Sequence, residues 1–277
     1  MPDHGPETRN YPKGRVFVQL RAFVFLGNWW WFGHVWFHKD QSMQPDVREL
    51  SKFYQTRLGE MTRLCISRRL GALWPDLSGR DVLSLGYGSA LLPMWDGQPR
   101  RLVNAMPSRQ GVEQWPATGP VQSTLVDPLS LPFAENSFDR ILITHCLEEV
   151  SDPSRFLQQT TRALAAGGRL ALIVPHRMGL WSASASSPFG HGRAYSNFQL
   201  SQLLEQAGLK PTARTQALFA PPHNWFAAPT GVRAWERTGE VFWPFFGGVL
   251  LVEAQKVRMI DPRARQIRPV FCPEPPS

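Results

Sequence analysis

The chain has 277 residues, of which 43% are hydrophobic and 19% are charged, and it carries a formal net charge of +8. It is long and apolar enough to bury the core of one domain with appendages. Half of the positive charge lies at the two ends, because residues 1–42 and residues 257–277 each carry two more basic than acidic side chains. The central part is mildly basic without a basic stripe, which argues against a nucleic-acid partner.

The three cysteines, Cys65, Cys146 and Cys272, are far apart and have neither CxxC spacing nor accompanying His ligands. This spacing argues against a zinc site and against a disulfide scaffold. We therefore expect a cytoplasmic protein with no metal.

Residues 16–37 are rich in Trp and Phe but are interrupted by polar residues and glycines. Three interpretations are open: an upstream extension with little fold, an interfacial membrane anchor, or a membrane span. We favour the first, with Met43 as the natural first residue, because a helix begins directly after it. On this interpretation residues 1–42 are a poorly structured extension and no stable membrane insertion is expected.

After Met43, apolar residues spaced by three and four predict one amphipathic helix from Asp46 to Leu73. Later helices have marked ends: Asp152-Pro153 starts one that Gly167-Gly168 closes, and Ser196–Gln199 is a capping box for another that runs to Gly208. A further helix over 234–241 should cover the sheet. Short apolar runs predict the strands 82–85, 101–105, 123–126, 141–144, 169–174, 212–218 and 249–254.

Alternation of these strands with helices predicts an α/β fold. We expect a Rossmann-like, doubly wound sheet of seven strands, mostly parallel with an antiparallel edge strand, and helices on both faces. The domain should span residues 43–257. The Pro/Arg-rich tail 258–277 should be disordered.

Two segments point to a ligand site: the strand and glycine turn Asp81–Ala90, and the turn and strand Leu131–His145. With the following His-x-Leu-Glu-x-Val, Asp-Pro and Gly-Gly-Arg-Leu patterns, they resemble class I S-adenosylmethionine-dependent methyltransferases. More narrowly, Gly86-Tyr87, Pro188–Ser196 and Trp243–Gly248 are similar to a bacterial branch of methyltransferase-domain proteins without an assigned substrate.

The resemblance implies that S-adenosyl-L-methionine is the cofactor and that Gly86 and Gly88 let the backbone approach it. A tight strand-to-helix turn without a ligand would also require these glycines. Asp127 matches the acid that receives the adenine amino group, although a turn aspartate before proline is the alternative. The implied cofactor-binding residues are Ser84, Gly86, Tyr87, Gly88, Met106, Asp127, Pro128, Leu129 and His145.

The chain departs from the family pattern at Ser84 and Met106, where acids are usual, and at Ala90, where a third glycine is usual. A hydrogen bond to a charged group contributes about 1.5–3 kcal/mol, so losing two weakens binding on the order of a hundredfold. Weak or lost cofactor binding follows from this departure.

His145 ends the fourth strand at the edge where open α/β sheets bind ligands. It is our candidate catalytic base, with a hydrogen-bonded wall residue as the alternative. Glu148 and Glu149 should lie on a solvated loop rather than transfer protons.

Polar residues after the fifth strand and in the glycine-rich loop should gather at the substrate mouth, where arginine suits an anionic acceptor. Loop residues that hold one another in place are the alternative. Trp181 and Trp225 should cover the sheet. The predicted substrate-binding residues are His176, Arg177, His191, Arg193 and Tyr195.

The resemblance thus implies methyl transfer from S-adenosylmethionine to an unidentified small-molecule acceptor. A non-catalytic binding or regulatory protein that kept the fold is the alternative, favoured by Ser84, Ala90 and Met106. A membrane-surface protein is a third hypothesis, which depends on residues 16–37. The sequence leaves the oligomeric state open.

Overall fold

The computed structural model describes the backbone at residues 17–20 and 35–38, and then residues 45–223 and 229–257. The strands β1 (Phe17–Leu20) and β2 (Val35–His38) pair with each other in antiparallel fashion. The rest of residues 1–42, Trp225 and the tail from 258 lie outside the described residues, so the expectations about them stay predictions. No described helix is long and apolar enough to cross a membrane.

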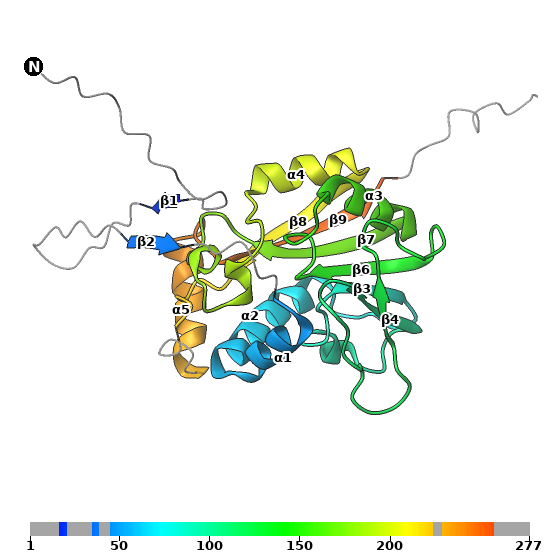
Figure 1. Cartoon of the computed structure of the whole chain (residues 1–277), viewed down its shortest axis with the longest axis horizontal. Helices are drawn as coiled ribbons and strands as arrows, with labels where there is room; N and C mark the ends of the chain where they lie inside the picture. Colours follow the sequence, from blue (N-terminus) through cyan, green and yellow to red (C-terminus); the bar gives the residue numbers. More distant parts are fainter. Residues whose placement is uncertain (1–16, 21–34, 39–44, 224–228, 258–277) are drawn as a thin grey trace, which may run out of the picture.

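From residue 138 onward strands and helices alternate along the chain, as the sequence predicts, whereas the three strands between residues 101 and 144 follow one another without a helix between them (Figure 1). The helices are α1 (Val47–Gln55), α2 (Arg57–Leu73), α3 (Pro153–Ala163), α4 (Asn197–Gln206) and α5 (Pro229–Phe242). The strands are β3 (Asp81–Gly86), β4 (Arg101–Pro107), β5 (Ser123–Val126), β6 (Phe138–Thr144), β7 (Leu164–Pro175), β8 (Leu209–Ala217) and β9 (Val249–Lys256).

These seven strands form one sheet in the order β5-β4-β3-β6-β7-β9-β8. The pairs from β5 through β7 are parallel, whereas β9 runs antiparallel to both β7 and the edge strand β8. The predicted Rossmann-like sheet with antiparallel pairing at one edge is therefore confirmed. The chain runs from β3 through β4 to β5 on one side, and the connection from β5 to β6 returns it to the other side of β3, so the strand order reverses at β3.

Helices cover both faces of the sheet, with α3 and α4 on one side and α1 and α2 on the other (Figure 1). Phe156 of α3 and Leu200 of α4 pack in one core cluster with alternate residues of the strands. Ile66 and Leu70 of α2 pack in a second cluster with the intervening strand residues, whose side chains lie on the other face of the sheet. The central strands are apolar on both faces because each face is covered.

The single helix expected from Asp46 to Leu73 is wrong, because the structure has two helices that break at Thr56. Thr56 is extended, and its hydroxyl accepts a hydrogen bond from Gly59 N at 3.0 Å, which makes it the N-cap of α2. A Cβ on Gly59 would lie 1.9 Å from the Phe53 carbonyl oxygen. A local threonine cap and a small residue thus turn the chain where apolar periodicity alone continues.

The Asp152 cap and the Ser196–Gln199 capping box are confirmed. The predicted stop at Gly167-Gly168 is wrong, because α3 ends at Ala163 and β7 begins at Leu164. The two glycines instead lie inside β7, where the pairing with β6 shifts register and Gly167 has a φ of +76°. Glycine accommodates this irregularity, as is usual at bulges.

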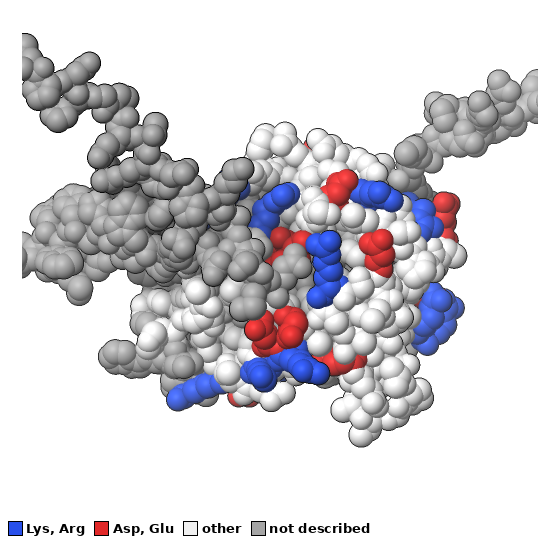
Figure 2. All heavy atoms as spheres, in the orientation of Figure 1, with Lys and Arg blue, Asp and Glu red and all other residues white. Residues whose placement is uncertain are grey.

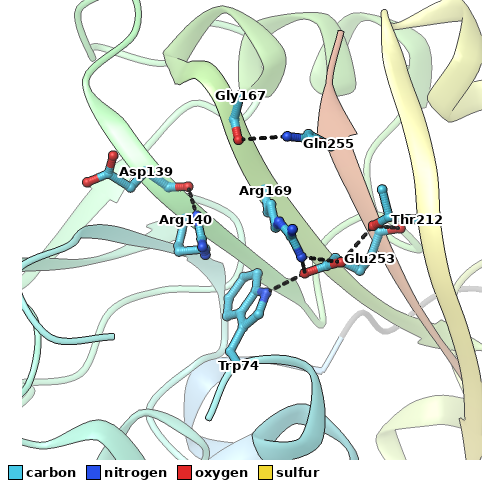
Figure 3. A network of polar contacts seen from close by, with 8 residues as sticks. All are labelled: Trp74, Asp139, Arg140, Gly167, Arg169, Thr212, Glu253 and Gln255. Carbon is cyan, nitrogen blue, oxygen red and sulfur yellow. Dashed lines mark hydrogen bonds and ion pairs between the residues drawn. The ribbon is translucent and has the colours of Figure 1, made fainter. Parts of the chain in front are cut away.

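Glu253 organises a polar network on the face of the sheet that α2 covers, away from the carboxyl ends of the parallel strands (Figure 3). Its carboxylate accepts hydrogen bonds from Trp74 Nε1 at 2.9 Å and Thr212 Oγ1 at 2.6 Å, and it pairs with Arg169 at 3.1 Å. Burial alone would raise the pKa of Glu253, but these three partners together lower it. The network therefore stabilises the ionised carboxylate and links β9 to β7, to β8 and to the end of α2.

Charged side chains of both signs are interspersed over the described surface of the face in Figure 2. They form no continuous stripe of one sign there. Among the described residues, no group of three or more His, Cys, Asp or Glu is placed to hold a metal ion.

We expect Glu253→Ala to destabilise the protein by about 2–4 kcal/mol, because three donors lose their acceptor. Glu253→Gln keeps one acceptor oxygen and should cost roughly half as much. Urea denaturation measures both changes, with Glu205→Ala on the exposed face of α4 as the control. Equal stability of all four proteins would contradict a structural role for this network.

Candidate functional site

The parallel strands end at one edge of the sheet, and the predicted cofactor residues follow their carboxyl ends. Gly86 closes β3, Met106 is near the end of β4, Asp127 follows β5 and His145 follows β6. This edge is where open α/β sheets place ligands.

The glycine turn after β3 is packed tightly within the chain. Gly86 has a φ of +93°, and a Cβ there would lie 2.1 Å from the Thr144 carbonyl oxygen. A Cβ on Gly88 would lie 1.9 Å from Ser84 Oγ. Both glycines are therefore needed for the turn itself, so they do not on their own indicate a ligand.

Met106 is fully buried in a small apolar cluster with Leu50 of α1 and Tyr87 of the glycine turn. The ring of Tyr54 stacks on Tyr87 with centroids 5.7 Å apart and planes inclined by 16°. Helix α1 therefore covers the turn and the end of β4. At Met106 the chain presents a thioether and no hydrogen-bonding carboxylate.

Three buried polar atoms beside the turn have no hydrogen-bond partner in the described structure: Ser84 Oγ, Asn104 Oδ1 and Thr144 Oγ1. They belong to β3, β4 and β6, where Ser84 pairs with Asn104 and Gly86 pairs with Thr144. Buried polar atoms normally have a partner, and each exception requires an explanation. A polar ligand at this edge would supply that partner.

Asp127 is exposed, and its Oδ1 accepts a hydrogen bond from Leu129 N at 2.9 Å. This contact forms an Asx turn, which is the arrangement expected of a turn aspartate, the alternative interpretation of Asp127. Pro128 and Leu129 are half-buried beside it. The carboxylate is thus fixed in direction and reachable from solvent.

His145 is held from several sides and has a φ of +50°, which is uncommon for a residue with a Cβ. Its Nε2 lies 2.8 Å from the Tyr54 hydroxyl, and its carbonyl accepts a hydrogen bond from Gln110 Nε2 at 2.7 Å. Phe189 packs on the ring at 4.7 Å between centroids. Burial lowers the pKa of His145 to about 3, so its ring is neutral at pH 7.

Glu148, expected on a solvated loop, is buried, and this correction matters for the site. Its Oε2 accepts a hydrogen bond from Cys146 N at 3.2 Å, and its Oε1 lies 3.6 Å from His145 Nδ1. Burial raises the pKa of Glu148 to about 8. Because burial favours the neutral forms of both groups, this contact is a neutral pair at pH 7 rather than an ion pair.

The predicted substrate residues lie along one rim formed by the ends of β7 and the loop 188–195. The backbones of His176 and Tyr195 form a β-bridge, and both side chains are buried. Tyr195 donates to the Leu147 carbonyl at 3.1 Å, and His176 Nδ1 lies 3.0 Å from the Gly247 carbonyl oxygen. These two side chains hold loops together, as the alternative interpretation describes.

Arg177 and Arg193 are exposed on the same rim, and His191 is half-buried. The Arg193 amide donates to the Glu148 carbonyl at 2.9 Å, which fixes this loop to the residues after β6. Trp181 is buried, with its Nε1 donating to the Ala220 carbonyl, as expected of a residue that covers the sheet.

Residues 83–172 match the family described as methyltransferase domain. Over these residues the chain is similar to a methyltransferase domain. Over 165 residues it is 27% identical to a demethylmenaquinone methyltransferase from Corynebacterium glutamicum, covering 59% of this chain and 64% of that protein. Over 114 residues it is 32% identical to the uncharacterized protein YafS from Escherichia coli, covering 41% and 43%.

The fold is also similar to that of solved methyltransferase structures. An S-adenosylmethionine-dependent methyltransferase from Thermotoga maritima superposes with a TM-score of 0.52 at 17% identity, covering 76% of this chain and 96% of that one. Similarity at this level shows the methyltransferase fold. The matches span less than two thirds of the length of the two curated relatives.

Tyr54, Gln110 and Phe189 contact His145 but were not predicted as site residues. Tyr54 reads as one apolar position of an amphipathic helix, and nothing in its local sequence indicates that it reaches a residue 91 positions away. Glycine-rich flanks did mark the loop that carries Phe189 as part of the site.

Glu148→Gln should change how stability depends on pH. The folded protein keeps Glu148 protonated up to a pKa of about 8, whereas the unfolded chain ionises it near the ordinary glutamate pKa of 4.5. Wild-type stability should therefore fall as pH rises through this window, and the glutamine variant should lose that slope. Thermal unfolding between pH 4 and 9 measures it, with exposed Glu205→Gln as the control. Identical profiles for wild type and Glu148→Gln would contradict a buried, protonated Glu148.

A double-mutant cycle should detect the contact between Tyr54 and His145. Tyr54→Phe leaves the buried Nε2 without its partner and should cost about 1–3 kcal/mol. His145→Asn keeps a residue type that tolerates the positive φ. We expect a coupling energy of about 1 kcal/mol from urea denaturation of both single variants and the double variant. Strictly additive losses would rule out this hydrogen bond.

Proposed function

We propose that the protein is an S-adenosylmethionine-dependent methyltransferase that acts on a small-molecule acceptor in the cytoplasm. The observation that carries the proposal is the group of buried, unpartnered polar atoms of Ser84, Asn104 and Thr144 beside the glycine turn. They lie at the ligand edge of a domain that matches a methyltransferase family. The buried, free cysteines Cys65 and Cys146 fit a reducing compartment.

The site fits parts of this cofactor to different degrees. Asp127 offers an accessible carboxylate for adenine, the half-buried Pro128 and Leu129 offer apolar contact beside it, and the polar atoms at the turn suit the amino-acid end of the cofactor. Met106 offers the ribose hydroxyls packing but no acceptor, and Tyr87 with Tyr54 fills the space beside it. We therefore propose weak binding that requires α1 to move.

S-adenosylmethionine, when bound, supplies an electrophilic methyl group on a sulfonium. The contribution of the chain is to position the acceptor and exclude water. Phe189 and Tyr54 shield the ring of His145, which is neutral, but the burial that lowers its pKa to about 3 also makes it a weak base in this closed arrangement. Because the Tyr54 hydroxyl already occupies Nε2, His145 acts as a base only when that hydrogen bond opens or passes the proton on.

Arg177 and Arg193 are the exposed cations of the rim, and they favour an acceptor with a carboxylate or another anionic group. His176, His191 and Tyr195 complete the proposed acceptor mouth, and the side chains of His176 and Tyr195 shape it through their hydrogen bonds to the Gly247 and Leu147 carbonyls.

A non-catalytic binding or regulatory role is the second candidate. The observation that favours it is the closed stack of Tyr54 on Tyr87 above a buried Met106, which needs no ligand to complete its packing. Fold alone does not distinguish the two functions.

Calorimetry with S-adenosylhomocysteine at millimolar concentration tests the proposal. We expect weak but measurable binding by the wild type, and at least tenfold weaker binding by Asp127→Ala, because a charged acceptor for the adenine amino group is lost. Glu205→Ala, which removes an exposed acid from α4, should bind like the wild type. Absence of both heat and a thermal shift would reject the enzyme in favour of the second candidate.

A further inference from the structure

The last turn of α5 and the loop after it expose a run of large apolar side chains. The exposed fractions are 73% for Val241, 70% for Phe242, 51% for Trp243, 72% for Phe245 and 49% for Phe246. We call these five residues, four of which are aromatic, the aromatic surface. Scattered exposed apolar residues are ordinary, but a contiguous group of this size marks a surface that contacts something other than water.

The aromatic surface is held on a fixed support. Helix α5 is tied to α2 by the ion pair of Arg69 and Glu240 at 2.5 Å, and buried Glu236 accepts a hydrogen bond from Phe219 N at 2.8 Å. A Cβ on Gly239 would lie 2.3 Å from Phe219 Cβ, so this side of α5 is closely packed. The exposed residues therefore project from an anchored helix end.

The loop also lies beside the proposed acceptor mouth. It leads into β9, whose first residue, Val249, pairs with Pro175 at the carboxyl end of β7. The amide of His176 donates to the Gly248 carbonyl at 3.0 Å. In Figure 1, α5 lies beyond the arrowheads of β6 and β7. The aromatic surface is thus at the ligand edge of the sheet.

Cations accompany the aromatic surface. Arg237 is exposed one turn before Val241, and Arg68 of α2 is exposed as well. The hydrogen bond from Arg69 is the main cause that lowers the pKa of Glu240, and the nearby charge of Arg68 lowers it further. A cleft of about 290 Å³ adjoins the loop at Pro244 and contains Arg214 of β8. Glu240 also lines this cleft, but its charge is paired with Arg69.

We propose that the aromatic surface docks onto the face of a lipid bilayer that contains anionic phospholipids. Trp and Phe side chains enter the boundary between headgroups and acyl chains, and the nearby arginines attract the lipid phosphates. The aromatic surface projects from a helix end, which suits insertion between lipids, and the net charge of +8 suits an anionic membrane. This is peripheral docking by side chains and requires no spanning helix.

The orientation has a consequence for the acceptor, which rests on the proposed function. Docking by this surface turns the acceptor mouth toward the bilayer, so we infer an amphiphilic acceptor that partitions into lipid. The docking itself is independent of methyl transfer.

Co-sedimentation of the full chain with vesicles tests the proposal without any cofactor. Wild type should bind vesicles of phosphatidylcholine with phosphatidylglycerol at least tenfold more tightly than vesicles of phosphatidylcholine alone. Phe242→Ser/Phe245→Ser should reduce binding to the anionic vesicles at least tenfold. Phe198→Ser, which removes an equally exposed phenylalanine (70%) from α4, is the matched control and should bind like the wild type.

Arg68→Gln/Arg237→Gln should also weaken binding to anionic vesicles while its thermal unfolding stays that of the wild type. Equal binding by wild type and Phe242→Ser/Phe245→Ser, or no binding by wild type, would overturn the proposal. Light scattering provides the remaining arm: a wild-type dimer that the double phenylalanine variant converts to monomer, without vesicle binding, would assign the surface to a second copy of the chain and reject the lipid. Because no cofactor is present, this result does not depend on S-adenosylmethionine binding.

Discussion

The parallel pairing of β3 with β4 on one side and β6 on the other decides which side chains meet at the ligand edge. The register places Ser84 beside Asn104 and Gly86 beside Thr144, so residues from three distant parts of the chain lie next to one another on adjacent strands. The tight glycine turn, the position of Met106 and the start of the His145 loop all follow from this register. A slip of one residue would turn these side chains to the other face.

The two polar clusters of the domain are built differently. Around Glu253, the side chains of Trp74, Thr212 and Arg169 all bond to the carboxylate, which is ionised and paired. At the ligand edge, Ser84 Oγ, Thr144 Oγ1 and Glu148 Oε1 lack hydrogen-bond partners, and burial keeps His145 and Glu148 neutral. Stability is concentrated where the network is satisfied, whereas incomplete satisfaction is typical of functional sites.

Elements with local signals could be predicted from the sequence. Strand β5 and the caps at Asp152 and Ser196 depend on neighbours within a few residues, and they are confirmed. The break at Thr56 was missed because a threonine cap competes with an apolar period that continues through it. Burial of Glu148 and the contact of Tyr54 with His145 depend on how α1 and the loop 188–195 close over the sheet, which no local pattern encodes. The sequence thus predicted a candidate site at this edge of the sheet but not the side chains that cover it.

The extended residue Thr56 separates α1 from α2, and it therefore gives the nine residues of α1 a pivot of their own. A ligand that needs the space occupied by the Tyr54–Tyr87 stack can bind only when α1 has moved away from the glycine turn. The measured affinity then equals the affinity of the open form multiplied by the fraction of molecules that are open. A substitution in α1 far from any ligand atom can thus tighten binding simply by making the closed arrangement less stable.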